Sequence, residues 1–123
     1  MTDTPPVHGY APTAVGVALS DCTARDAETV LRVLCTAFRS DRRPTEHPDQ
    51  DATVWLTTLD VSSLPAPCVT RPLSGPVTAD IQGGHEALDR VRAALTKAFT
   101  VSEATAAHGD QEEELHLRLT THH

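Results

Sequence analysis

Aromatic residues and long apolar runs are both scarce in this chain of 123 residues. Phenylalanine, tyrosine and tryptophan together make up 3% of it, and there is a single tryptophan. A pocket that stacks a large planar ligand needs more aromatic side chains than this, so we expect none. No apolar run approaches the roughly 20 residues of a membrane-spanning helix or the roughly 7 to 15 of a signal-peptide core. We therefore expect a soluble protein that does not bind membranes.

Cysteine is also scarce, and its pattern excludes two classes of small protein. Cys22, Cys35 and Cys68 are odd in number and contain no C-x-x-C pair. This pattern predicts neither a disulfide framework nor a cysteine-based metal site, and it favours a reduced, cytoplasmic location. Cys22 precedes a predicted helix, where a thiolate is stabilised, but a lone cysteine is more often inert.

Positive charge is limited, which excludes most nucleic-acid partners. Lysine and arginine number 10 against 17 acidic residues, and the formal net charge is −7. Such a charge repels phosphate backbones. The one basic cluster, at Arg39, Arg42 and Arg43, is interrupted by Asp41. We expect no nucleic-acid partner.

What the chain does contain is an internal repeat. A shift of 61 positions superimposes Ala37-Phe38 on Ala98-Phe99 and His47-x-Asp49-Gln50 on His108-x-Asp110-Gln111. The same shift aligns four further apolar pairs: Val30 with Val91, Leu34 with Leu95, Val54 with Leu115, and Leu56 with Leu117. Matches spread over this length indicate a duplicated structural unit. Each copy contributes only about 47 ordered residues, so the two copies should share one core.

The repeat also sets the expected domain organisation. Residues 1–12 hold three prolines and no periodicity, which predicts a disordered leader. Residues 13–61 form the first copy and residues 77–121 the second, within a single pseudo-twofold domain. Between them, residues 62–76 contain four prolines, which predicts a linker without regular structure.

Each copy is expected to contain a strand, a helix and a hairpin. Residues 14–20 alternate as a half-buried strand, and residues 24–38 carry apolar side chains at helical spacing after a capping Thr23-x-x-Asp26. In the strand over residues 52–61 we expect Val54, Leu56 and Thr58 to face the core. The second copy repeats this order, with a strand from residue 77, a helix after Gly83-Gly84, and strands over 100–107 and 114–120 that direct Leu115, Leu117 and Leu119 inward.

The expected fold class is α+β: tandem duplicated strand-helix-strand-strand (ferredoxin-like or SHS2-like) units form one mostly antiparallel sheet with two helices on one face. Crossover connections are almost always right-handed, which places both helices on the same side. This order of elements is similar to that of GyrI-like small-molecule-binding domains and, more distantly, to paired vicinal-oxygen-chelate modules. The resemblance covers the order of elements and carries over no ligand or metal residue.

The sheet face turned away from the helices is the main candidate for function. Alternation assigns six candidate residues to it: Trp55, Thr57, Leu59, Asp80, His116 and Arg118. A solvated sheet face normally carries polar side chains, so the lone tryptophan and a leucine there indicate that something covers it. Tryptophan and arginine are favoured interface anchors. The leading hypothesis is a non-enzymatic binding or accessory protein that forms a homodimer through this face, or docks another protein on it.

Two alternatives use the same face. It could hold a small-molecule ligand, with Trp55 as an aromatic wall and Asp80, His116 and Arg118 as polar contacts. Less favoured is a small enzyme with His116 as general base, oriented by Asp80, and Arg118 as an anion clamp. The sequence contains no complete catalytic motif, and we expect no cofactor.

The repeated His-x-Asp-Gln is the only pattern that suggests a metal. His47, Asp49, His108 and Asp110 could ligate a divalent ion if a twofold relation brought the two turns together. Aspartate beside proline or glycine between two strands is, however, what a hairpin turn prefers. We therefore expect turn chemistry at both places and no metal.

Overall fold

The computed structural model describes residues 13–40, 53–62, 71–108 and 113–121, with the backbone alone for 104–108. The predicted leader and the middle of the predicted linker lie outside these ranges. In chain order the elements are β1 (Ala14–Ser20), α1 (Ala24–Ala37), β2 (Arg39–Ser40), β3 (Val54–Asp60), β4 (Val77–Gly83), α2 (His85–Ala98), β5 (Phe99–His108) and β6 (Glu113–Thr121). The order strand, helix, strand, strand thus occurs twice.

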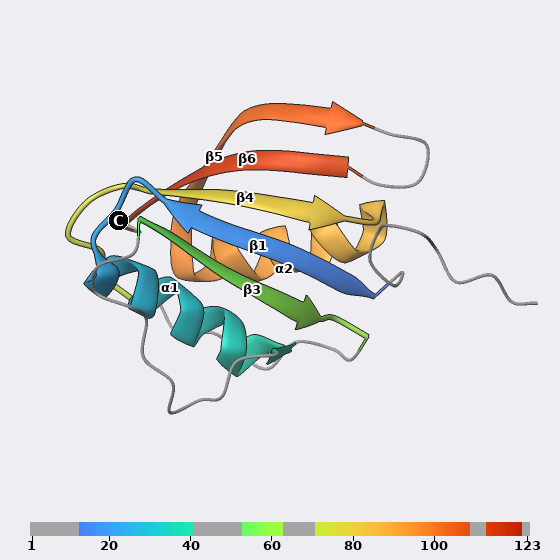
Figure 1. Cartoon of the computed structure of the whole chain (residues 1–123), viewed down its shortest axis with the longest axis horizontal. Coiled ribbons are helices and arrows are strands. Elements are labelled where there is room, and N and C mark those ends of the chain that lie inside the picture. The colour runs from blue at the N-terminus through green and yellow to red at the C-terminus, as the bar shows by residue number, and fades with distance from the viewer. Residues whose placement is uncertain (1–12, 41–52, 63–70, 109–112, 122–123) are drawn as a thin grey trace, which may run out of the picture.

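The strands form one open antiparallel sheet with two helices packed on it, which is an α+β fold. Its strand order is β2-β3-β1-β4-β6-β5, and every neighbouring pair is antiparallel. In the view of Figure 1, β1 and β4 pass in front of α2, so the sheet face without helices is turned toward the viewer. The first strand of each half, β1 and β4, lies at the centre of the sheet.

Both helices begin and end at matching positions, for local reasons. The side chain of Thr23 accepts a hydrogen bond from the backbone N of Asp26 at 3.1 Å, which caps α1, while Gly84 starts α2 without a side-chain cap. Phe38 and Phe99 turn the chain into extended conformation, and their N–H groups close the last helical turns. Because both phenylalanines are buried, each fixes a helix end against the sheet.

Asp26 does not complete the capping box that its spacing suggested. Its carboxylate is buried and accepts hydrogen bonds from Ser74 N at 3.0 Å, Ser74 Oγ at 2.8 Å and Gly75 N at 3.1 Å. One residue earlier, the backbone N of Leu73 donates a hydrogen bond to Thr121 Oγ1 at 3.0 Å, and Thr121 Oγ1 donates one to the Leu73 carbonyl oxygen at 2.9 Å. The end of the segment that connects the two halves is therefore fixed to α1 on one side and to β6 on the other.

One continuous core lies between the sheet and the helices. The apolar stripes of both helices are buried, as predicted, and so are the inward positions of β1, β4 and β6. The largest side chains buried to within 2% of complete are Phe99, Leu19, Leu34, Leu59, Ile81, Leu88, Leu95, Leu117 and Leu119. Both halves contribute to this list, so the core is shared between them.

The prediction for β3 is wrong, because the strand has the opposite face inward. Trp55, Thr57 and Leu59 are buried on the helix side, with exposed fractions of 4%, 4% and 0%. Val54 and Leu56, expected in the core, are 48% and 65% exposed on the other face. Trp55, Thr57 and Leu59 are therefore not on the helix-free face, and they cannot have the interface role that depended on this placement.

The physical reason is the period of a strand, which is two. The buried residues of β3 and β6 all have odd numbers, so the strands match at an even shift, such as the 60 positions between Trp55 and Leu115. The shift of 61 that aligns the helices is odd, and it maps an inward position onto an outward one. From Phe38 to Trp55 there are 17 positions, and from Phe99 to Leu115 there are 16. A difference of one residue is enough to exchange the two faces of a strand.

Candidate interaction face

We use the term open face for the helix-free side of four adjacent strands in the sheet, β3, β1, β4 and β6. Ala14, Asp60 and Thr120 lie at its margins. Its other described residues are Val54, Leu56, Thr58, Gly16, Ala18, Ser20, Thr78, Asp80, Gln82, Glu114, His116 and Arg118. The strand register orders them in three rows across the sheet. The central row is Leu56, Ala18, Asp80 and His116. The open face therefore has an apolar half on β3 and β1 and a polar half on β4 and β6.

The apolar half combines protruding and very small side chains. Among the described residues, Val54 and Leu56 are the large hydrophobic side chains that are exposed, while Gly16 and Ala18 next to them leave the backbone of β1 uncovered. The result is a shallow depression of about 300 Å³. Its lining residues are Gly16, Val17, Ala18, Leu56, Thr57, Thr58, Asp80, Gln82 and Glu114. Leu56 thus stands at one side of the depression, and acidic side chains stand at the other.

In the polar half, the structure brings together two of the predicted site residues. His116 Nδ1 and Asp80 Oδ1 are hydrogen-bonded across β4 and β6, with side chains 38% and 31% exposed. A carboxylate on Nδ1 fixes the ring orientation and directs Nε2 away from the pair, which suits a general base. Within the described ranges, however, no serine, threonine or cysteine side chain is hydrogen-bonded to His116.

Glu114 and Arg118 flank His116 on the same strand and the same face. Glu114 is half-buried and pairs in register with Gln82, while Arg118 is exposed and pairs with Thr78. Among the residues that the structure describes, neither Glu114 nor Arg118 forms a salt bridge. Two opposite charges therefore lie on the open face without compensating each other.

The other predicted site residues lie elsewhere. Trp55, Thr57 and Leu59 face the core, where the Thr57 hydroxyl and Ser40 Oγ form a hydrogen bond at 2.8 Å. Asp80, His116 and Arg118 lie on the open face, and their role there stays a prediction.

The candidate metal ligands cannot be placed. His47, Asp49 and Asp110 lie outside the described residues, and so does the side chain of His108 at the end of β5. In the described part of the chain, no group of three or more His, Cys, Asp or Glu residues is arranged to hold a metal ion.

Sequence reasoning missed Val54, Leu56 and Thr58 as members of the open face. A signal for them existed in the strand period. The alternation that correctly places Leu115, Leu117 and Leu119 inward assigns the odd positions of β6 to the core. Applying an even shift to β3 would have placed Leu59 inward and Leu56 outward.

Two reactive side chains outside the open face are held in unreactive or local arrangements. The pKa of Cys22 is raised to about 11, first by burial and then by the charges of Asp26 and Asp21, so this thiol is a poor nucleophile. The pKa of His85 is raised, mainly by its hydrogen bond with Glu113. His85 thus contacts Glu113 of β6 and Asp89 one turn along α2.

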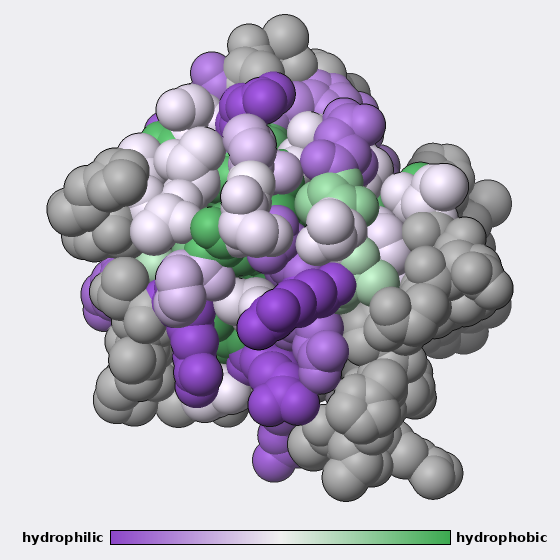
Figure 2. All heavy atoms as spheres, turned by 90° about the vertical axis from the view of Figure 1, so that its left-hand side faces the viewer, coloured by the Kyte–Doolittle hydropathy of each residue, from purple (hydrophilic) through white to green (hydrophobic). Residues whose placement is uncertain are grey.

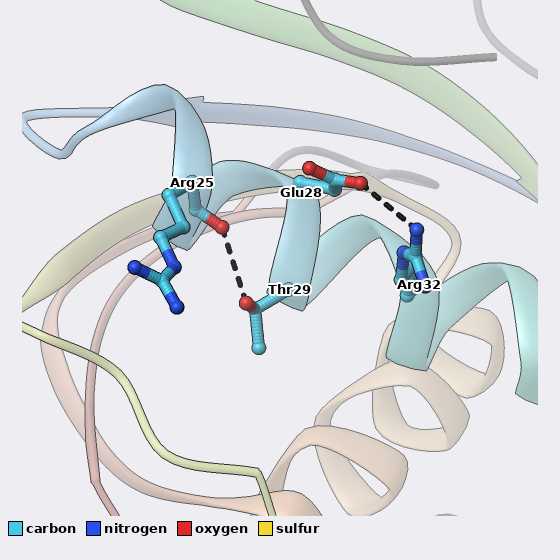
Figure 3. A network of polar contacts seen from close by, with 4 residues as sticks. All are labelled: Arg25, Glu28, Thr29 and Arg32. Carbon is cyan, nitrogen blue, oxygen red and sulfur yellow. Dashed lines mark hydrogen bonds and ion pairs between the residues drawn. The ribbon is translucent and has the colours of Figure 1, made fainter.

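The outer side of α1 carries two polar contacts within the helix. Figure 3 shows Arg32 paired with Glu28 at 3.0 Å, and the Thr29 hydroxyl donating to the Arg25 carbonyl at 3.1 Å. Figure 2 shows the end of the molecule where β1 leads into α1: hydrophilic residues gather in its lower part, and apolar residues occur in small separate areas. These two surfaces have the character of solvated ones, which leaves the open face as the candidate site.

No protein-family model matches the chain, and neither does any curated protein or solved structure. Across the described ranges, none of the helices has the length and apolar character needed to cross a membrane. The functional argument therefore starts from the open face.

Proposed function

We propose that this chain is a non-enzymatic protein-interaction module that forms a homodimer through its open face. The observation that carries the proposal is the exposure of Val54 and Leu56 beside Gly16 and Ala18 on a face that no described helix or strand covers. The solvated side of an antiparallel sheet normally alternates to polar residues. An apolar half-face of this kind is typical of a surface that is buried in an assembly.

The size of the open face fits this role. Four strands of seven or more residues, about 4.8 Å apart with a rise of about 3.3 Å per residue, cover a plan area of roughly 440 Å². Side chains project from this plane, so the accessible area is larger. Two such faces together have a plan area of roughly 880 Å², and the projecting side chains bring the area that could be buried toward the lower end of the range of about 1,200–2,000 Å² found in stable complexes.

The repeated order of elements supports a second part of the proposal, which concerns origin. We propose that the two halves descend from one strand-helix-strand-strand unit and are related by pseudo-twofold symmetry about the β1–β4 pair. The helices match at a shift of 61 residues, and both end at a buried phenylalanine. In such a protein the two halves of the open face were initially alike and have since diverged into an apolar and a charged half.

The test is light scattering coupled to size-exclusion chromatography on wild type and Leu56→Asp. A dimer that uses the open face should dissociate in the variant, because the substitution would bury an unpaired carboxylate at the interface. Ala93→Asp makes the same charge change on the exposed side of α2 and should leave the dimer intact. A wild-type monomer, or a dimer insensitive to Leu56→Asp, would refute the proposal.

A second candidate function rests on the depression. Its volume of about 300 Å³ matches the smallest ligand pockets, which begin near 300 Å³, and it joins an apolar wall to acidic side chains. This lining suits a small amphipathic amine. If the protein is monomeric, hexylamine should raise its melting temperature, and Asp80→Asn should abolish the rise. No shift with wild type would exclude this binding mode.

A further inference from the structure

We infer that the twofold axis of the homodimer lies between the two open faces and runs parallel to the row Leu56, Ala18, Asp80 and His116. With this axis, Glu114 of each copy meets Arg118 of the other. This inference rests on the proposed function and specifies its partner as a second copy in one register. It uses the distribution of charge on β6 and the position of Leu56 at the opposite end of the same row.

The charges on β6 are arranged in a self-complementary way. Glu114, His116 and Arg118 face the same side at two-residue spacing, so each charged residue lies about 6.6 Å along the strand from His116. A rotation of 180° about an axis through His116 and perpendicular to the strand exchanges the two ends. In a twofold interface, a contact from Glu114 to Arg118 of the second copy is then necessarily repeated from Arg118 to Glu114. Both charges are compensated by one operation.

The same axis also places the apolar half of one copy against the apolar half of the other. Leu56 lies in the central row, so the rotation places it opposite Leu56 of the second copy. Two sheets that pack face to face are about 10 Å apart, with strands within about 30° of each other. A leucine from each side spans this gap, and the small Ala18 next to it in the row does not obstruct the contact. The apolar half thus becomes the dry part of the interface.

The alternative axis, parallel to the strands and between β1 and β4, gives a worse interface. It would place β6 of one copy against β3 of the other, with Glu114 opposite Thr58 and Arg118 opposite Val54. Both charges would be buried without a partner of opposite sign, which is strongly destabilising. The perpendicular axis pairs both of these charges while covering Leu56, and it brings the hydrogen-bonded Asp80 and His116 opposite the same pair of the second copy.

Charge reversal tests the register directly. Glu114→Arg places two arginines against each other at both symmetry-related contacts, and Arg118→Glu places two glutamates there. Because a like-charge contact of this kind costs several kcal/mol, we expect each variant to dimerise at least tenfold more weakly than wild type. The double variant Glu114→Arg/Arg118→Glu restores opposite charges and should dimerise like wild type.

An equimolar mixture of the two single variants is the most specific measurement. In a heterodimer of the two, Arg at 114 meets Glu at 118, and the unchanged Arg118 meets the unchanged Glu114. Light scattering should therefore show a dimer in the mixture, although each component alone is mainly monomeric. The reversals Glu86→Arg and Arg25→Glu, on exposed helix positions, are the matched controls and should leave dimerisation unchanged.

The outcomes separate this inference from the proposed function. A wild-type dimer that Leu56→Asp dissociates, together with charge variants that do not weaken it or do not rescue each other, would overturn the register and leave the open-face dimer standing. A monomeric wild type would overturn both. Far-UV circular dichroism of every variant verifies that a monomer is folded rather than unfolded.

Discussion

Substitutions at two adjacent residues, Trp55 and Leu56, test the orientation of β3, on which the whole assignment of the open face depends. Trp55 is 4% exposed and Leu56 65% exposed. A tryptophan buries about 150–250 Å². At about 25 cal/mol per Å², loss of that area corresponds to roughly 4–6 kcal/mol. Trp55→Ala should therefore destabilise the fold by about 3–5 kcal/mol, the usual range for such a truncation in a core.

The expected effect of Leu56→Ala is much smaller. Full burial of a leucine side chain contributes about 1.5–3 kcal/mol, and only about a third of this side chain is covered, so the loss is about 0.5–1 kcal/mol. The difference between the two variants is then at least about 2 kcal/mol in the free energy of unfolding. For a domain whose total stability is about 5–15 kcal/mol, this difference is easily measured.

The measurement is urea unfolding followed by far-UV circular dichroism. Fluorescence is unsuitable because Trp55 is the only tryptophan. A low protein concentration keeps dimerisation from contributing to the apparent stability. Leu117→Ala, at a position 1% exposed on β6, is a positive control with an expected loss of about 2–5 kcal/mol. If Leu56→Ala proves as costly as Trp55→Ala, or costlier, β3 has the opposite face inward and the open face is wrongly composed.

Three further predictions concern single side chains. Glu113→Gln should lower the pKa of His85 toward its ordinary value of about 6.5, because the hydrogen bond with Glu113 is the main cause of its raised pKa. The pKa of His85 is higher in the folded state than in the unfolded state, so the stability that its contact with Glu113 contributes is complete below about pH 6.5 and is lost as the pH rises through the raised pKa. The variant should therefore be less stable than wild type in mildly acid solution and equally stable in alkaline solution. NMR titration of His85 measures the shift, and an unchanged titration would contradict the cause given. Cys22, with a pKa of about 11, should react with iodoacetamide at pH 8 far more slowly in the folded protein than in urea. The reason is that only about one thiol in a thousand is ionised in the folded protein at this pH. Equal rates, measured by peptide mass spectrometry, would show that the thiol is accessible and ionised. Asp26→Ala should lower the free energy of unfolding by about 2–4 kcal/mol, because it removes the buried carboxylate that accepts three hydrogen bonds from Ser74 and Gly75. Thr23→Ala should lose only about 1 kcal/mol as a capping residue. Equal losses in urea unfolding would show that Asp26 acts as a capping residue alone.

Periodicity was sufficient to predict the helices and the inward face of three of the four strands that form the open face. Both helices have one apolar stripe with polar residues elsewhere, so a single orientation buries the stripe. In β6 the alternation of Leu115, Leu117 and Leu119 with charged residues allows one inward face. Local pattern alone determines such elements, because only one face can enter a core without burying charge.

The orientation of β3 could not be read in this way, because apolar residues occupy both of its faces. Val54 and Leu56 compete with Trp55 and Leu59, and each set alternates correctly. The shift of 61 residues, which aligns Val54 with Leu115, is odd and therefore gives the wrong face. Tertiary packing decides in favour of the set with the larger side chains, which leaves the exposed pair on the open face.

About half of the candidate site could therefore be predicted from the sequence. Asp80, His116 and Arg118 lie on strands whose orientation the sequence determines, so their common face followed from alternation. Asp26 shows a different kind of limit. Its position in the first turn of α1 is apparent from the sequence, but its contact with Ser74 joins residues 48 positions apart, which no local pattern reveals.

The divergence of the two halves explains why the open face can recognise itself. The inward side chains of β3 and β6 both fill the core, so the two halves differ in the outward side chains of these strands. These are Val54 and Leu56 on β3, and Glu114 and Arg118 on β6. A twofold axis parallel to the strands would match apolar with charged residues, which desolvates charge without compensation. An axis perpendicular to the strands matches each strand with its own copy, so leucine meets leucine and glutamate meets arginine. Asymmetry between the halves thus selects one of two otherwise similar dimers, and the mutual rescue of Glu114→Arg and Arg118→Glu is the property that only this dimer should have.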